Sequence, residues 1–128
     1  MRKILYILII FIISISVTAQ ECNIKTLKPK AFQEKINTLE DALILDCSTI
    51  EGFQKGHIEG AILIATSEMM TSILKDTTKD TPLLVYCKYG ERSKKAIKKI
   101  KALGFKKIYQ LKKGLSAWKR KGLPITKY

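Results

Sequence analysis

Cys87, Gly90, Arg92 and Ser93 fall within seven residues of one another and have side chains suited to chemistry. An uninterrupted apolar run at residues 83–86 comes directly before them. Such short runs are typical of strands buried on both faces. Because a helical pattern follows Ser93, the sequence predicts a tight loop between the carboxyl end of a buried strand and a helix N-terminus. Open parallel sheets bind their ligands at this position.

Each residue type in this loop has a role in binding a thiolate or an oxyanion. The loop amides and the positive end of the helix dipole would stabilise a thiolate at Cys87. Gly90 permits a tight turn, and Arg92 offers a planar, permanently charged fork that suits oxyanions. Ser93 can cap the helix that follows. A merely structural buried cysteine is the alternative, and the coincidence of these residue types argues against it.

The elements that must position this loop alternate along the chain. Strands are predicted at residues 24–27, 42–45, 61–65, 83–86 and 108–111. Helices are predicted at 29–37 and 51–55, from a cap at Ser67, from Ser93 to Gly104, and at 115–119. The alternation predicts an α/β fold with a five-stranded parallel sheet flanked by helices on both faces.

Three segments resemble the rhodanese family of sulfurtransferases. The sequence Cys-Lys-Tyr-Gly-Glu-Arg-Ser at 87–93 is similar to that family's Cys-x-x-Gly-x-Arg-Ser active loop. Leu-Asp at 45–46, followed by Gly-His-Ile-Glu-Gly-Ala at 56–61, resembles a second motif. Gly-Leu-Ser-Ala-Trp at 114–118, followed by Gly-Leu-Pro at 122–124, resembles a third. The resemblance extends from residue 24 to residue 125 and implies a rhodanese-like fold, in which the strands ending at Asp46 and Cys87 are neighbours.

The resemblance also implies an activity. The Cys87 thiolate would take a sulfane sulfur from a donor such as thiosulfate and pass it, from a persulfide, to a thiophilic acceptor such as cyanide or a thiol. Cys87 is therefore the expected catalytic residue. The expected substrate-binding loop consists of Lys88, Tyr89, Gly90, Glu91, Arg92 and Ser93. The reaction requires no metal and no organic cofactor, and the expected partners are small sulfur-containing anions or thiols.

Asp46, Cys47 and His57 are predicted to support the loop rather than to react. Asp46 is expected to shape the loop by hydrogen bonding, and His57, the only histidine, to hold a turn. Cys47 stands near the place where many members of the family carry an arginine, so one organising contact is missing. It fills a strand end or, as a riskier hypothesis, resolves oxidised Cys87 into a disulfide. Glu91 is expected to weaken the attraction of the loop for anions.

Two other functions remain open from the sequence. A non-enzymatic persulfide carrier or binding module would use the same cysteine without turnover. Phosphatases and arsenate reductases of the same fold have a similar loop, but with five residues between cysteine and arginine. Here only four intervene, at 88–91, and the smaller loop fits a single sulfur better than a tetrahedral oxyanion.

Residues 1–19 have the pattern of a secretory signal peptide, with Arg2 and Lys3 before an apolar run and small residues before Gln20. We therefore expect an exported protein, periplasmic or secreted, with a single rhodanese-like domain at residues 20–128. Contact with a membrane is expected only through an uncleaved leader. Three cysteines are an odd number, which suits a free thiol in an exported protein.

The chain is strongly basic. Subtracting the two cations of the leader from the net charge of +13 leaves +11. Lysine-rich helix faces are usually solvated, and a charge of this size attracts anionic substrates. No motif for nucleic-acid binding accompanies the charge, so nucleic acid is not an expected partner.

Overall fold

The computed structural model describes residues 21–128. The predicted signal peptide lies outside these residues. Within them, no helix combines the length and the apolar character that crossing a bilayer requires.

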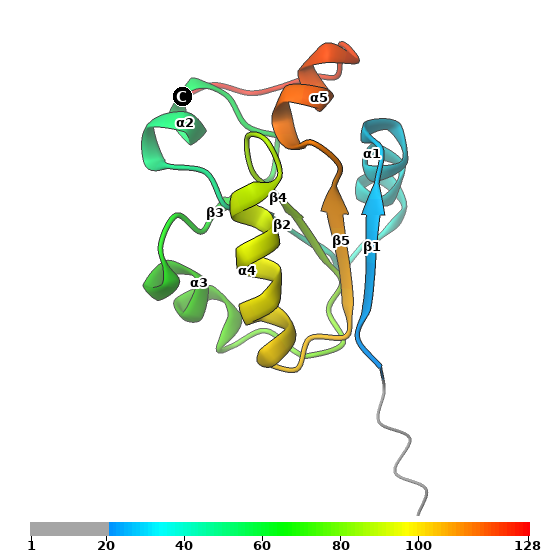
Figure 1. Ribbon diagram of the computed structural model, residues 1–128, viewed down its shortest axis with the longest axis vertical. Coiled ribbons are helices and arrows are strands. Elements are labelled where there is room, and N and C mark those ends of the chain that lie inside the picture. The colour runs from blue at the N-terminus through cyan, green and yellow to red at the C-terminus, as the bar shows by residue number, and fades with distance from the viewer. Residues whose placement is uncertain (1–20) are drawn as a thin grey trace, which may run out of the picture.

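Five strands and five helices alternate along the described chain (Figure 1). The strands are β1 (Asn23–Leu27), β2 (Leu43–Asp46), β3 (Ile62–Leu63), β4 (Leu83–Tyr86) and β5 (Lys107–Leu111). The helices are α1 (Pro29–Thr38), α2 (Ile50–Lys55), α3 (Ser67–Leu74), α4 (Glu91–Ala102) and α5 (Gly114–Arg120). The strands form one sheet in the order β1-β5-β4-β2-β3, and every pair is parallel. The predicted α/β fold is confirmed, and β2 and β4 are neighbours, as expected for the strands that end at Asp46 and Cys87.

Helices cover both faces of the sheet, and each face has its own apolar core. On one face, Met70 of α3 and Ile97 of α4 pack on Leu45 and Val85. On the other face, Phe32 of α1 and Trp118 of α5 pack in one core with Tyr86 of β4. Strand β4 lies in the middle of the sheet, and all four of its residues are buried. Its unbroken apolar sequence follows from burial on both faces.

Two predicted boundaries are corrected by local hydrogen bonding. The Thr66 hydroxyl, rather than Ser67, caps α3 by accepting a hydrogen bond from the amide of Met69. Ser67 is instead the first residue of the helix. Strand β3 is also shorter than the predicted 61–65, because only Ile62 and Leu63 pair with β2 at this edge of the sheet.

The segment after α5 joins two of the sequence motifs. The indole of Trp118 donates a hydrogen bond to the carbonyl of Pro124 (2.9 Å). His57 and Thr126 form an antiparallel bridge, with N–H···O distances of 2.9 and 2.8 Å. These hydrogen bonds hold the segment around Thr126 beside the Gly56–His57 turn, at the carboxyl ends of the strands.

Candidate functional site

Cys87 is the first residue after β4, and its sulfur lies inside a tight loop that leads into α4. The side chain is buried, with 1% of its surface exposed. The amide of Gly90 donates to Sγ at 3.0 Å, and the amide of Ser93 donates at 3.4 Å. Gly90 has a φ of 105°, a left-handed conformation that glycine adopts at little cost. The loop therefore directs backbone donors onto the sulfur, as the sequence predicted.

The predicted role of Ser93 as the helix cap is wrong. Helix α4 begins two residues earlier, at Glu91, and its N-cap is Gly90, which has no side chain to offer. Ser93 is instead fully buried in the first turn. Its hydroxyl donates to the carbonyl of Gly90 (3.0 Å), and the Cys87 thiol donates to this hydroxyl at 3.5 Å. Ser93 therefore links the sulfur to the turn of the loop.

Gln110 belongs to the site and was not predicted. Its side-chain amide reaches from β5, the neighbour of β4, and donates to the carbonyl of Gly90 (3.1 Å) and to the Ser93 hydroxyl (2.9 Å). It thus ties two points of the loop to the sheet. The only indication in the sequence is a polar glutamine between Tyr109 and Leu111, near the end of a predicted strand.

The N-terminus of α5 holds the loop from the other side. The amide of Leu115 donates to the carbonyl of Cys87 (2.8 Å), and that of Ser116 donates to the carbonyl of Lys88 (3.0 Å). Gly114 makes this approach possible, because a Cβ there would clash with the backbone of Cys87 and Lys88. The Gly-x-x-x-Trp motif thus has a physical reason: its glycine admits the loop, and its tryptophan anchors α5 in the core.

Arg92 fastens the loop to the ends of two other strands. Its Nε donates to the carbonyl of Cys47, just after β2 (2.8 Å), and one Nη donates to the carbonyl of Ala65, just after β3 (3.3 Å). The guanidinium therefore acts as a positioning group. It carries five N–H donors in all, so donors remain after these two hydrogen bonds.

Cys47 lies beside Cys87 at the end of the neighbouring strand. Its amide donates to the carbonyl of Tyr86 (2.7 Å), and both cysteine side chains belong to the core under α3 and α4. Burial, followed by the proximity of Cys87 and of Asp46, raises the pKa of the Cys47 thiol well above its usual range, although Arg92 opposes the shift. At neutral pH, Cys47 is therefore a protonated thiol and a poor nucleophile. The disulfide hypothesis is thus supported by the proximity of the two cysteines, but the protonated Cys47 thiol is unfavourable for it.

Asp46 shapes the turn after β2 rather than the Cys87 loop. Its Oδ1 accepts a hydrogen bond from the amide of Ser48 (2.8 Å), and within residues 21–128 its buried Oδ2 has no hydrogen-bond partner. Tyr86 is its neighbour in register on β4. Burial and the Asp46 carboxylate raise the pKa of the Tyr86 hydroxyl, which accepts a hydrogen bond from the amide of Ile58 (2.9 Å).

His57 is buried away from the loop, and its contacts are those of a structural residue. Its Nδ1 lies 2.8 Å from the carbonyl of Phe53, and its ring stacks on that of Phe53 with a centroid distance of 3.7 Å. These contacts hold the turn after α2.

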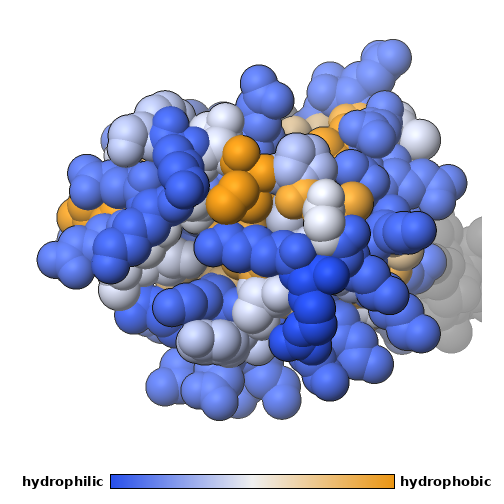
Figure 2. All heavy atoms as spheres, turned by 90° about the horizontal axis from the view of Figure 1, so that it is seen from above, coloured by the Kyte–Doolittle hydropathy of each residue, from blue (hydrophilic) through white to orange (hydrophobic). Residues whose placement is uncertain are grey.

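The other loop side chains face solvent. Tyr89 is 63% exposed, and the Lys88 ammonium lies over its ring, 5.3 Å from the centroid. Glu91 is exposed at the start of α4. Figure 2 looks down on the face where the strands end: hydrophilic side chains cover most of it, with a small apolar group near its centre. The loop therefore opens onto a largely polar surface.

Similar proteins agree with this architecture. A family model described as the rhodanese-like domain matches residues 28–121. A sulfurtransferase of Allochromatium vinosum is 27% identical over 97 residues, which cover 76% of this chain and 90% of that protein. The solution structure of the rhodanese-like domain of Alr3790 from Anabaena is 25% identical, with a TM-score of 0.70 over 80% of this chain and 79% of that domain.

A third relative is longer than this chain. YrkF of Bacillus subtilis, whose name provisionally describes a sulfur carrier protein, is 30% identical over 89 residues. The match covers 70% of this chain but 48% of YrkF, so the chain spans about half the length of that relative.

Proposed function

The chain belongs to the rhodanese-like domain family, and we propose that it is a sulfurtransferase that carries sulfur as a persulfide on Cys87. The observation that carries the proposal is the geometry around Sγ, where the amides of Gly90 and Ser93 converge on one buried sulfur. The remaining amides in the first turn of α4 have no partner within the helix. These donors are available to the outer, negatively charged sulfur of a persulfide.

The reaction consists of two displacements at sulfur. The Cys87 thiolate attacks the outer sulfur of a donor such as thiosulfate, the S–S bond of the donor breaks, and sulfite leaves with the electron pair. A thiophilic acceptor, such as cyanide or a thiol, then attacks the outer sulfur of the persulfide and returns the Cys87 thiolate. Such covalent catalysis gives ping-pong kinetics. Backbone donors stabilise the negative sulfur in both steps.

Turnover with thiosulfate and cyanide tests this proposal. The purified protein should form thiocyanate, and double-reciprocal plots at several cyanide concentrations should be parallel. A Cys87→Ser variant should lose this turnover, whereas Cys22→Ser, which removes a cysteine before β1, should retain it. Full activity in the Cys87→Ser variant would refute the assignment.

A persulfide carrier is the second candidate, and the similarity to YrkF favours it. A carrier would form the same persulfide but would release it only to a dedicated acceptor protein. Stable persulfide on Cys87 with no thiocyanate formed from cyanide would favour the carrier over the enzyme.

Export is part of the proposal and rests on the pattern of residues 1–19. Protein recovered from its native host should begin at Gln20, after cleavage behind Ala19. N-terminal mapping that finds Met1 on a cytoplasmic product would contradict export.

A further inference from the structure

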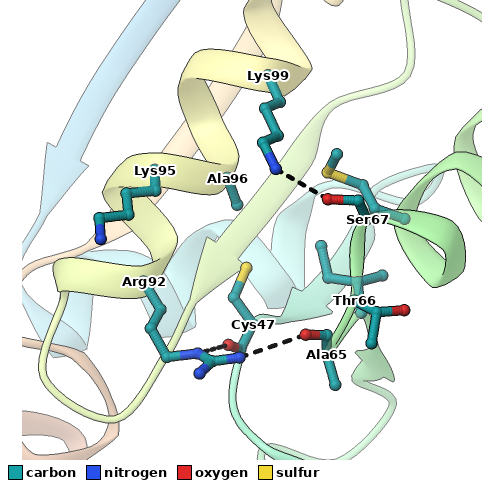
Figure 3. Close-up of a pocket in the computed structure, with 10 residues that line it drawn as sticks. Cys47, Ala65, Thr66, Ser67, Arg92, Lys95, Ala96 and Lys99 are labelled. Atoms are coloured by element: carbon teal, nitrogen blue, oxygen red, sulfur yellow. Dashed lines mark hydrogen bonds between the residues drawn. The ribbon is translucent and has the colours of Figure 1, made fainter.

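A hollow lies between α3 and α4, next to Arg92 of the active loop, and Cys87 is not among the residues that line it. Its volume is about 230 Å³. Cys47, Ile64, Ala65, Thr66, Ser67, Met70, Arg92, Lys95, Ala96 and Lys99 line it. Figure 3 shows Arg92 and Lys99 reaching across from α4, and the Cys47 sulfur pointing toward Ala96. The hollow is below the range of about 300–1,000 Å³ that drug-sized ligands occupy, so its size suits a small molecule.

The rim of this hollow is cationic. Arg92 uses two of its N–H groups on the carbonyls of Cys47 and Ala65, which leaves other donors of the guanidinium free. The Lys99 ammonium donates one hydrogen bond to the Ser67 hydroxyl (2.8 Å). Lys95 lines the same rim, and its ammonium points outward (Figure 3). Among residues 21–128, no acidic residue lines the hollow, so the three cations at its rim have no carboxylate among them.

The floor of the hollow is apolar. Ile64 and Met70 are 5% and 6% exposed, and the partly buried Ala96 packs against the same core. The thiol of Cys47 adds a polarisable, uncharged surface, since burial raises its pKa and keeps it protonated. A fully hydrated inorganic anion gains nothing from such a floor, whereas an alkyl group does.

We propose that this hollow, lined by Arg92, Lys99 and Lys95 above Ile64, Met70 and Ala96, is a binding site for a small organic anion with a short apolar segment. A carboxylate or sulfonate group would accept hydrogen bonds from the free guanidinium donors of Arg92 and from the Lys99 ammonium, and the outward-pointing Lys95 would add its positive charge at the rim. The alkyl segment would lie on the apolar floor. Cys87 does not line the hollow, so the inference does not depend on sulfur transfer.

Alkanesulfonates are suitable probes, because they carry the anionic group and offer no transferable sulfur. Titration of the Cys87→Ser protein with butanesulfonate, followed by amide NMR shifts, should move resonances of α3 and α4 around the hollow. Methanesulfonate should bind more weakly because its apolar part is a single methyl group, and the neutral isostere butanesulfonamide should bind more weakly because it lacks the charge. Shifts confined to the 87–93 loop would overturn the proposal, as would equal affinity for all three compounds.

Paired lysine variants on α4 separate this site from general attraction by a basic protein. The Lys95→Gln/Lys99→Gln variant should weaken butanesulfonate binding about tenfold, through the loss of the charge-assisted hydrogen bond from Lys99 and of the positive charge of Lys95. The control, Lys98→Gln/Lys101→Gln, removes the same charge from exposed positions of the helix that do not line the hollow. It should change the affinity less than about twofold. Equal weakening in both variants would show diffuse electrostatic attraction and would refute the site.

Discussion

The sulfur of Cys87 receives hydrogen bonds from backbone amides, and the surrounding side chains secure that backbone. Ser93 and Gln110 hold the carbonyl of Gly90, and Arg92 holds the ends of β2 and β3. Glu91 is different, because its side chain is exposed in the first turn of α4. The residue-scale predictions concern Glu91 and Arg92.

Glu91 should reduce the rate at which anionic donors reach the loop. In the Glu91→Gln variant, kcat/KM for thiosulfate should rise about threefold, because a negative charge beside the site is removed. The increase should shrink at high ionic strength, where salt screens the charge. Glu34→Gln, which neutralises an exposed acid on α1, is the control and should leave kcat/KM unchanged. An unaltered kcat/KM in Glu91→Gln would show that this charge does not affect the donor.

Arg92 should be replaceable by lysine only at a cost to activity. Lysine keeps the charge but lacks the planar fork that donates to two carbonyls at once. Losing one hydrogen bond from a charged group should lower kcat/KM about tenfold. Arg120→Lys, at an exposed position of α5, should leave turnover unchanged. Wild-type turnover in Arg92→Lys would mean that the two hydrogen bonds do not position the loop.

At the scale of elements, the sequence predicted the repeating pattern and missed contacts between distant segments. The apolar run of β4 and the lysine-covered face of α4 are local patterns, so both elements were predicted, although α4 begins at Glu91 rather than at Ser93. The contact of Gln110 with Ser93 depends on β5 lying beside β4, and local patterning does not reveal it. The prediction of Ser93 as the cap was wrong for a different reason: serine is a preferred capping residue, whereas the left-handed backbone of Gly90 sets the start of α4.

The packing of α5 against the loop gives a sharp test of one glycine. Gly114→Ala should lower the free energy of unfolding by about 2 kcal/mol or more, because the new Cβ meets loop backbone at a position with positive φ. Atoms of Lys88 would lie only 2.6 Å from this Cβ. Urea denaturation measures the change.

Gly122 provides the matched control. It also has a positive φ, of 72°, but within residues 21–128 a Cβ there would have no atom within 4 Å other than those of its two chain neighbours. Gly122→Ala should therefore lower the free energy of unfolding by only about 1 kcal/mol, the cost of holding alanine in a left-handed conformation. Equal losses in the two variants would show that close packing of α5 on the loop is unimportant.

At the scale of the whole molecule, the buried Cys47 thiol and Tyr86 hydroxyl should make the free energy of unfolding fall at high pH. The folded state raises the pKa values of Cys47 and Tyr86. Well below about pH 9, both groups are protonated in the folded and in the unfolded chain, and their contribution to stability is fully present. At higher pH the unfolded chain releases these two protons while the folded chain keeps them, so the free energy of unfolding falls. The slope reaches about 1.4 kcal/mol per pH unit for each group.

Urea midpoints between pH 8 and pH 10.5 should therefore fall less steeply in Cys47→Ala than in the wild type. The titration of the many exposed lysines also changes stability in this pH range, but it is the same in both proteins and cancels when their slopes are compared. Identical slopes in wild type and Cys47→Ala would contradict a raised Cys47 pKa.

The central claim is that Cys87, and no other residue, carries the sulfur. The direct measurement is the intact mass of the protein after treatment with thiosulfate under non-reducing conditions, together with peptide mapping of the adduct. We predict one added sulfur, about 32 Da, on Cys87 of the wild type, removed by cyanide and absent from Cys87→Ser. An adduct that persists in Cys87→Ser, or that maps to Cys47 or Cys22 in the wild type, would contradict the account.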